Sequence, residues 1–397
     1  MFNGGYNPDT KRKVIGQGTY GCIIKPAYTK SKKAKPSKVS KIGLIGETND
    51  NEVKIGKIIR TIPKFKNFFS PILTSTHLHL HSTKQVETQE CHLVVKNEER
   101  NPVPEKSEGN KYVVHTMDYV GKNRLEEHFI ELLKNKPIQY IHSHLIQCHN
   151  HLLTAFIQLK KANLIHFDLN VGNVMITDKR NTPILIDFGL SFEAPEKGVS
   201  LKIQDTPFFT YSGDYTPWCI DIIVIAYYVQ KKRGFLHKTN VDSSVLVGLL
   251  DDQIAANGSV FSRYMNEGEQ TRYRNNVKMY FDSWNGKSAM DLYKDLYNAR
   301  FTWDNYAGAV LMLKLVKNMD LRSPLMDAYR NVLIDVLTAA PNKRMDAAAL
   351  QSRINGLPKT TILRGQQKLN TNVEIGKKIK NIQASIHYAK GQRQLLA

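Results

Sequence analysis

The chain has 397 residues, of which 41% are hydrophobic and 23% are charged. Because a domain takes about 150 residues, this length accommodates two compact domains, and the composition excludes a globally disordered protein. The formal net charge of +20 would attract polyanions such as nucleic acid, acidic lipid surfaces or acidic protein segments. A solvated basic surface explains the same charge, so charge alone identifies no partner.

The cysteines and the apolar runs bear on compartment and membrane. The four cysteines are scattered without C-x-x-C spacing, at Cys22, Cys91, Cys148 and Cys219. This pattern indicates neither a zinc site nor a disulfide framework and favours a reducing compartment. Residues 1–20 lack a signal-peptide core, and the longest apolar run, residues 220–229, is interrupted by Asp221 and too short to cross a bilayer. We therefore expect an intracellular protein that is not inserted in a membrane.

The first part of the chain predicts a mostly β domain with one helix. Residues 14–24 indicate a strand, a glycine turn and a second strand. The apolar run 39–42 predicts another strand, and residues 51–62 repeat apolar side chains at helical spacing. Two further apolar stretches, 92–95 and 112–117, flank a polar segment at 96–110 that we expect to be an exposed loop.

The pattern then becomes helical. Residues 125–133 and 142–159 carry long helical periodicity, and most of the chain to about residue 350 follows it. The expected fold is α+β and bilobal, with a small β-rich N-lobe (1–120) and a larger, mostly helical C-lobe (121–357). Residues 358–397 contain eight Lys or Arg against one acid, Glu374, and we expect them to form a basic appendage.

Three glycines, Gly16, Gly18 and Gly21, form a G-x-G-x-x-G pattern. Glycines let backbone N–H groups approach phosphate oxygens closely, although a turn that needs positive φ explains them equally well. A dinucleotide-binding site would need a helix directly afterwards, whereas the next residues indicate a strand. The hairpin context therefore favours a flap over nucleotide phosphates.

Lys41 lies within an apolar strand, which is costly unless its ammonium group meets a carboxylate or a phosphate. Glu52, at the start of the next helix, is the expected partner, and Glu47 is the competing candidate. Such a pair would direct the lysine towards the α- and β-phosphates of ATP.

The segment His166-Phe167-Asp168-Leu169-Asn170-Val171-Gly172-Asn173 sets a carboxylate and a carboxamide five residues apart. Asp168 can accept a proton from a substrate hydroxyl, and Asn173 can bind a metal ion. Asp187-Phe188-Gly189 follows an apolar strand and offers a second carboxylate for metal and phosphates. We interpret His166 as structural.

In this order the motifs resemble the eukaryotic-type protein kinase superfamily over roughly residues 10–355. The resemblance implies ATP with magnesium or manganese, a glycine flap, a Lys41–Glu52 ion pair, Asp168 as catalytic base, and Asn173 and Asp187 as metal ligands. It also implies an adenine pocket with Met117 as gatekeeper, a hinge at Asp118-Tyr119-Val120, and a lining of Ile15, Ile23, Val39, Met175 and Ile186. Residues 39–41 and 52–58 are similar to the divergent kinases of large nucleocytoplasmic DNA viruses. That similarity implies a host cytoplasm or virion location, with nucleic acid or acidic virion proteins as contacts of the basic surface.

The chain departs from the family in three ways. Asn170 stands where Ser/Thr kinases place a lysine, which removes a charge near the transferring phosphate. No A-P-E follows the D-F-G. Gly172-Asn173 is similar to small-molecule phosphotransferases. Asp221 resembles the aspartate that ties a central helix to the catalytic loop, and Arg344 resembles the family's late arginine.

We therefore predict a protein serine/threonine kinase, with protein hydroxyls as acceptors. The alternatives are a catalytically weak scaffold with a polyanion-binding surface, and a small-molecule kinase with an acidic pocket around residues 251–304. Candidate regulatory hydroxyls in the activation segment are Thr206, Thr210, Tyr211, Ser212 and Thr216.

Overall fold

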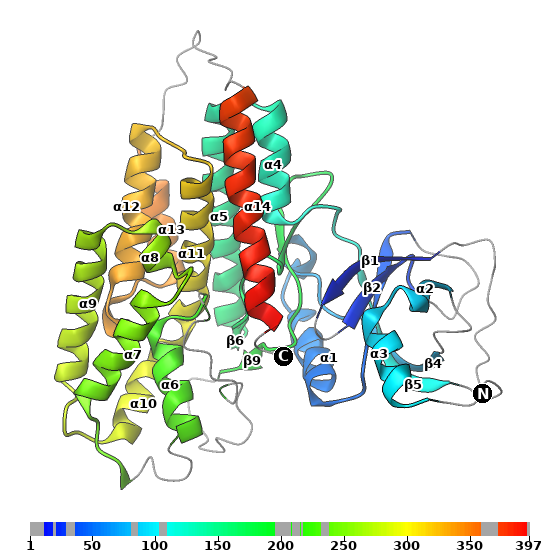
Figure 1. The fold of residues 1–397 in the computed structure, drawn as a ribbon, viewed down its shortest axis with the longest axis horizontal. Coiled ribbons are helices and arrows are strands. Elements are labelled where there is room, and N and C mark those ends of the chain that lie inside the picture. Colours follow the sequence, from blue (N-terminus) through cyan, green and yellow to red (C-terminus); the bar gives the residue numbers. More distant parts are fainter. Residues whose placement is uncertain are drawn as a thin grey trace. The chain divides into compact units, whose positions relative to one another are not determined.

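The computed structural model describes residues 12–18, 21–28, 36–80, 86–102, 109–194, 208, 215, 217–231, 238–358 and 372–394 (Figure 1). The predicted regulatory hydroxyls at 206, 210, 211, 212 and 216 lie outside these residues. The chain divides into two compact units. The first contains residues 1–121 and 184–191, and the second contains residues 122–183 and 192–396.

The first unit is built on a five-stranded antiparallel sheet in the order β1-β2-β3-β5-β4. Its strands are β1 (Lys13–Gly18), β2 (Gly21–Lys25), β3 (Lys38–Gly43), β4 (Thr74–Leu80) and β5 (Asn110–Asp118). The glycine hairpin and the strand at 39–42 are therefore confirmed. β3 is the middle strand, and all of its residues from Val39 onwards are buried. A side chain on β3 is consequently held by neighbours on both sides.

The helices of this unit are α1 (Glu47–Ile59), η1 (Phe65–Asn67), α2 (Val86–Gln89) and α3 (His92–Arg100). The sequence interpretation of residues 92–100 was wrong, because they form a helix and not an apolar stretch running into a loop. A four-residue apolar run fits a buried helix turn as well as a strand. Val94 is completely buried in a cluster with Cys22, Ile42 and Tyr112, which favours the helix.

Cys22 on β2 and Cys91, directly before α3, form a disulfide with a Cα–Cα distance of 5.8 Å. The cysteine spacing, which indicated no disulfide framework, therefore did not predict this bond. Spacing rules could not find this bond, because its cysteines are 69 residues apart and meet only when α3 packs on the sheet. The other two cysteines, Cys148 and Cys219, are free and buried.

Removing this disulfide should lower the free energy of unfolding of the first unit by about 2–4 kcal/mol, because the bond restricts a long loop in the unfolded chain. Denaturant titration of the wild type with and without reductant, and of the Cys22→Ala/Cys91→Ala double variant, measures this difference. The double variant is its own control, since reductant should not change it further. Equal unfolding midpoints for all samples would contradict the prediction.

The second unit is mostly helical, which confirms the α+β fold with a β-rich N-terminal part. Its helices are α4 (Leu125–Asn135), α5 (Ile138–Lys161), α6 (Ile220–Lys231), α7 (Ser243–Ala255), α8 (Val260–Tyr264), α9 (Glu267–Asp282), α10 (Ala289–Asn298), η5 (Arg300–Thr302), α11 (Trp303–Asn318), α12 (Pro324–Thr338), η6 (Pro341–Lys343), α13 (Ala347–Asn355) and α14 (Asn372–Gln394). Nearly every residue of α11 is buried, so this helix forms the centre of the unit. The unit also contains three short strands, β6 (Leu164–Ile165), β7 (Val174–Ile176) and β9 (Phe192–Glu193). No helix among the described residues is long and apolar enough to cross a membrane.

The basic C-terminal segment contributes a helix to this unit. α14 packs against α4 and α11, and it runs beside α4 in Figure 1. Ile382 is completely buried in this contact, while Lys377 and Lys380 are exposed. Residues 359–371 lie outside the described part of the chain. The helix thus combines an apolar contact with a charged outer surface.

Helix α5 carries buried histidines that make the second unit sensitive to acid. Burial lowers the pKa of His142 to about 4 and that of His149 to about 3. Both are neutral in the folded state, while in the unfolded chain they take up protons below about pH 6.5. The stability that these neutral histidines contribute is therefore complete above pH 6.5 and is lost as the pH falls through about 4 for His142 and about 3 for His149.

We expect the free energy of unfolding to fall by about 1 kcal/mol per pH unit for each such histidine between pH 6 and 4. Urea titrations at several pH values measure the slope. His149→Gln should make it shallower, because glutamine does not titrate and can still accept the Tyr329 hydroxyl bond of 2.8 Å that reaches His149. The exposed His387 provides the control, since His387→Gln should not change the slope. A slope that His149→Gln leaves unchanged would contradict the prediction.

Candidate active site

Lys41 lies on the middle strand β3, and its ammonium group meets two carboxylates. Nζ is 2.8 Å from Oε2 of Glu52 on α1 and 2.9 Å from Oδ1 of Asp187. Lys41 is 7% exposed and Glu52 is 2% exposed, so both charges are almost removed from water. The pairing expected from the sequence is present, with Glu52 and not Glu47 as the partner.

The surroundings keep Lys41 charged. Burial alone would lower the pKa of its ammonium group, but the charges of Asp187 and Glu52 outweigh burial and raise that pKa above its ordinary value. His115 lies opposite Lys41 on β5, and burial together with the Lys41 charge lowers the pKa of this histidine to about 4. At neutral pH Lys41 is therefore a cation beside a neutral imidazole.

The Asp187-Phe188-Gly189 segment is anchored within the first unit. It follows β8 (Pro183–Leu185), where the Ser70 backbone N–H donates to the Leu185 carbonyl at 2.9 Å. The Asn51 side chain on α1 donates to the carbonyls of Gly189 and Ser191 at 3.1 and 2.9 Å. Asp187 has a left-handed φ of 62°, and its side chain is 41% exposed. These contacts hold a solvent-accessible carboxylate beside Lys41.

Of the three flap glycines, the fold requires only Gly21. A Cβ there would lie 2.2 Å from the Ile42 carbonyl oxygen, which excludes any other residue. At Gly16 a Cβ would meet only the Ile23 side chain, at 3.7 Å, and at Gly18 the nearest atom is 4.0 Å away. Strand packing therefore does not explain Gly16 and Gly18.

The residues predicted to line an adenine pocket differ in how far they are buried. Val39 and Met117 are buried in one cluster with Ile72, against which the partly buried Ile23 packs. Ile15 is 50% exposed. The predicted hinge residues Asp118, Tyr119 and Val120 are half-buried in the first unit, as is Ile186, which directly follows β8. Met175 is half-buried on β7 of the second unit. The Asp118 carboxylate pairs with Lys38, and its carbonyl accepts a bond of 3.0 Å from Ser70.

Within the second unit, two amide side chains hold the Asp168 carboxylate. Asn170 Nδ2 donates to Oδ1 at 2.8 Å, and Asn173 Nδ2 donates to Oδ2 at 2.9 Å and to the Asp168 carbonyl at 2.7 Å. Asn170 Oδ1 accepts from the Gly172 N–H at 2.9 Å. Asn170 is only 7% exposed, so its amide stabilises the loop. Asn170 thus orients the Asp168 carboxylate.

Asp304 at the start of α11 holds the backbone of the loop that leads to Asp168. Its carboxylate accepts the backbone N–H groups of His166 and Phe167 at 2.8 and 3.0 Å, and Phe167 has a left-handed φ of 68°. The sequence interpretation had given this role to Asp221, which was wrong. Both aspartates lie in the first turn of apolar helices, so the sequence pattern could not separate them.

Asp221 instead pairs with Arg344. The Nη2–Oδ2 distance is 2.9 Å, and both side chains are completely buried. Arg344 also donates to the Thr302 hydroxyl at 3.0 Å and lies over the Tyr306 ring. The partner of Arg344 is therefore this aspartate, which replaces the glutamate that the sequence lacks.

The described residues provide oxygen ligands of the kind that magnesium prefers. The two bonds from Asn173 Nδ2 to Asp168 fix the orientation of its amide, so its Oδ1 points away from that carboxylate. Asp187 offers a partly exposed carboxylate. No group of three or more His, Cys, Asp or Glu suited to a metal ion occurs among the described residues. Magnesium usually takes one or two protein oxygens and completes its shell with phosphates and water, so the oxygen that each of these residues offers within its own unit is of the kind that magnesium binds.

A comparison with protein families bears on this arrangement. Residues 68–200 match the model of the RIO domain, an atypical protein-kinase-like family. The chain is similar to atypical protein kinases. The match spans about a third of the chain and includes Asp168, Asn173 and Asp187, while the glycine flap and Lys41 precede it. It supports a kinase-like, ATP-binding phosphotransferase. No curated protein sequence matches the chain.

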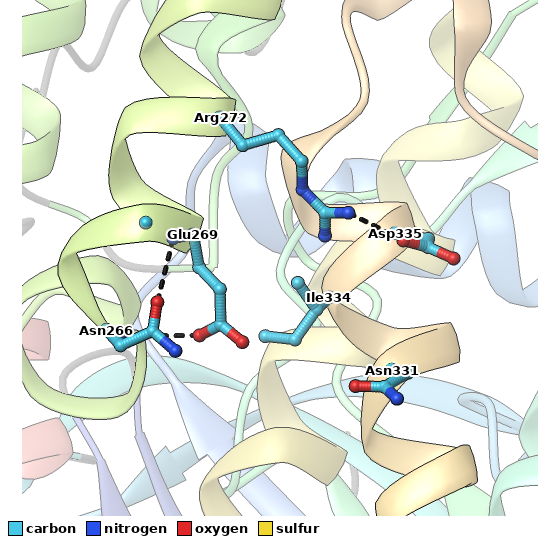
Figure 2. A pocket seen from close by; sticks show the side chains of 7 residues that line it. Asn266, Glu269, Arg272, Asn331, Ile334 and Asp335 are labelled. Carbon is cyan, nitrogen blue, oxygen red and sulfur yellow. Dashed lines mark hydrogen bonds and ion pairs between the residues drawn. The ribbon is translucent and has the colours of Figure 1, made fainter.

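A pocket between α9 and α12 lies elsewhere in the second unit (Figure 2). Its acids are neutralised, because Glu269 forms two bonds with Arg330 at 2.7 and 2.8 Å and Asp335 lies 3.2 Å from Arg272. None of the predicted site residues lines it. Its paired charges do not form the acidic pocket that a cationic small-molecule substrate would need.

Sequence reasoning missed one further contact of the Asp168 carboxylate. The Tyr215 hydroxyl donates to Asp168 Oδ1 at 2.5 Å and accepts from Asn170 Nδ2 at 3.1 Å. No motif marks Tyr215, since the sequence shows only a tyrosine two residues before Pro217.

Proposed function

We propose that the chain is a protein serine/threonine kinase that transfers the γ-phosphoryl group of ATP to protein hydroxyls. The observation that carries this proposal is the arrangement of Asp168. Its side chain is partly exposed, and both of its carboxylate oxygens accept bonds from amide side chains. Asp304 holds the backbone of the loop just before it. A general base must lie within hydrogen-bond reach of a hydroxyl, and Asp168 already accepts one.

The first unit supports the nucleotide part of the proposal. Lys41 supplies a desolvated cation for phosphate oxygens, and Glu52 prevents it from turning away. Gly16 and Gly18 leave open space that strand packing does not need, as expected where a phosphate approaches the backbone. Asn173 and Asp187 would hold magnesium, which neutralises phosphate charge when bound.

Phosphate transfer with labelled ATP and magnesium tests the proposal, with casein, a basic protein and the chain itself as acceptors. We expect label on serine or threonine, identified by phosphoamino-acid analysis. Nucleotide binding without transfer to any acceptor would favour the scaffold. Transfer to a small alcohol or amino sugar, with none to protein, would favour the small-molecule kinase.

Replacing Lys41 with methionine should lower phosphoryl transfer about 10²–10³-fold, because it removes a preorganised charge and leaves Glu52 buried without its cation. Transfer assays and binding of a fluorescent ATP analogue measure the effect, with circular dichroism to check folding. Lys111→Met is the matched control, since Lys111 is exposed and lies on neighbouring strand β5. Wild-type transfer by Lys41→Met would overturn this lysine's role.

A further inference from the structure

The strand register divides the glycine hairpin between the two faces of the sheet. Gly16 on β1 lies opposite Ile23 on β2, and Ile23 lies opposite Lys41 on β3, so these three residues share one face. Gln17 and Cys22 lie opposite each other at the next position, and their side chains belong to the other face. The side chain of Gln17 therefore lies on the face opposite to that of Lys41.

The Gln17 side chain binds the backbone where α2 ends and α3 begins. Its Nε2 donates to the Glu90 carbonyl at 2.8 Å, and its Oε1 accepts the His92 N–H at 3.0 Å. One amide group thus bridges the two residues that flank Cys91. Because Cys91 provides no side-chain cap for α3, Gln17 also satisfies an N–H group that the first helical turn leaves without an internal partner.

The segment to which Gln17 binds is firmly attached to the sheet. Cys91 forms the disulfide with Cys22, the residue opposite Gln17 in the hairpin. Cys91 and Tyr112 on β5 are completely buried in one apolar cluster, and the Asn97 side chain on α3 donates to the Tyr112 hydroxyl at 2.9 Å. The start of α3 is therefore held by a covalent bond, by packing and by a hydrogen bond.

A flap made of glycines is costly to order. Glycine loses more conformational freedom than any other residue when its backbone is fixed, and Gly16 and Gly18 stand on either side of Gln17. A flap that is already held in place does not lose this freedom again when a ligand binds, so the ligand binds more tightly. Within this three-residue segment only Gln17 has a side chain that can hold the flap.

We propose that Gln17 is a positioning residue for nucleotide binding, which fixes the glycine flap to the disulfide-linked start of α3; this rests on the nucleotide part of the proposed function. The face that carries Lys41 then meets ATP with its flap backbone already ordered. Gln17 acts through the position of Gly16 and Gly18 and contacts no nucleotide itself. A role limited to capping α3 would stabilise the first unit but would not distinguish ATP from adenosine, which lacks the phosphates.

Binding titrations of the full-length protein with magnesium, using ATP and adenosine in turn, measure this role. Gln17→Met keeps the length of the side chain and removes both hydrogen bonds. We expect it to raise the Kd for ATP about 5- to 10-fold, as for two exposed hydrogen bonds, and to change the Kd for adenosine less than about twofold. Gln89→Met, which alters an exposed glutamine on α2, is the matched control and should bind ATP like the wild type.

The disulfide provides a second check on the anchor. In the Cys22→Ala/Cys91→Ala double variant, α3 has lost its covalent bond to the hairpin, so the Gln17 bonds hold the flap less firmly. Gln17→Met should therefore weaken ATP binding less in this background than in the wild type. An effect of the same size in both backgrounds would overturn the part of the disulfide in the anchor.

The remaining outcomes separate this inference from the proposed function. Wild-type ATP affinity in Gln17→Met would overturn the inference and leave the proposed function in place. Equal losses of affinity for ATP and adenosine would do the same, because Gln17 would then be a helix cap only. If the wild type binds ATP but transfers no phosphate, the kinase proposal fails, and the two Kd values still decide the role of Gln17. A wild type that binds no ATP would remove both.

Discussion

Replacing Asp168 with asparagine should lower phosphoryl transfer about 10²–10⁴-fold and change ATP affinity only a few-fold. An amide has the shape of the carboxylate but cannot take the proton of an acceptor hydroxyl. The nucleotide contacts assigned to Lys41 and the glycine flap lie in the other unit and are not altered. Transfer assays and ATP-analogue titration on the same preparation measure both quantities.

The matched control for this prediction is Asp252→Asn, an exposed carboxylate on α7 of the same unit. It should transfer phosphate at the wild-type rate. An Asp168→Asn protein that keeps full transfer would exclude Asp168 as the base. If the wild type itself transfers nothing but binds ATP, and the variant still performs the biological role, the scaffold alternative is the better interpretation.

Replacing Arg344 with leucine should destabilise the second unit by about 3–5 kcal/mol, because it leaves the Asp221 carboxylate completely buried without its partner. Replacing both residues with leucine should recover much of the loss, since no unpaired buried charge remains. Urea unfolding of the wild type, the two single variants and the double variant forms a complete cycle.

The control for this cycle is an ion pair of the same chemistry at the surface. Arg353 pairs with Asp335, and the Arg353 side chain is 46% exposed. Arg353→Leu should therefore cost less than about 1 kcal/mol. Equal losses for Arg344→Leu and Arg353→Leu would mean that burial does not determine the strength of the Asp221–Arg344 pair.

Local patterns in the sequence were sufficient to predict most of the helices and strands and to name many residues of the candidate site. The glycine hairpin, the strand around Lys41 and the long helices follow from periodicity over a few neighbouring residues, and the fold class followed from their order. The Lys41–Glu52 pair was predictable because a lysine in a buried strand needs a nearby acid, and the next helix offers few. The roles of Asp168, Asn173 and Asp187 in catalysis stay predictions that the experiments above test.

Contacts between distant segments were decided by the tertiary structure alone. Two aspartates lie in the first turn of apolar helices, and only packing determines that Asp304 binds the backbone at His166 while Asp221 pairs with Arg344. Cys22 and Cys91 form a disulfide because α3 packs on the sheet. The Tyr215 hydroxyl forms a hydrogen bond with Asp168, which lies 47 residues earlier in the chain. Sequence alone therefore determined local periodicity and the chemical groups present. The packing of the core decided which of these groups come into contact. A buried charge or hydroxyl needs a hydrogen-bonding partner, and only the folded chain determines which group lies within hydrogen-bond distance.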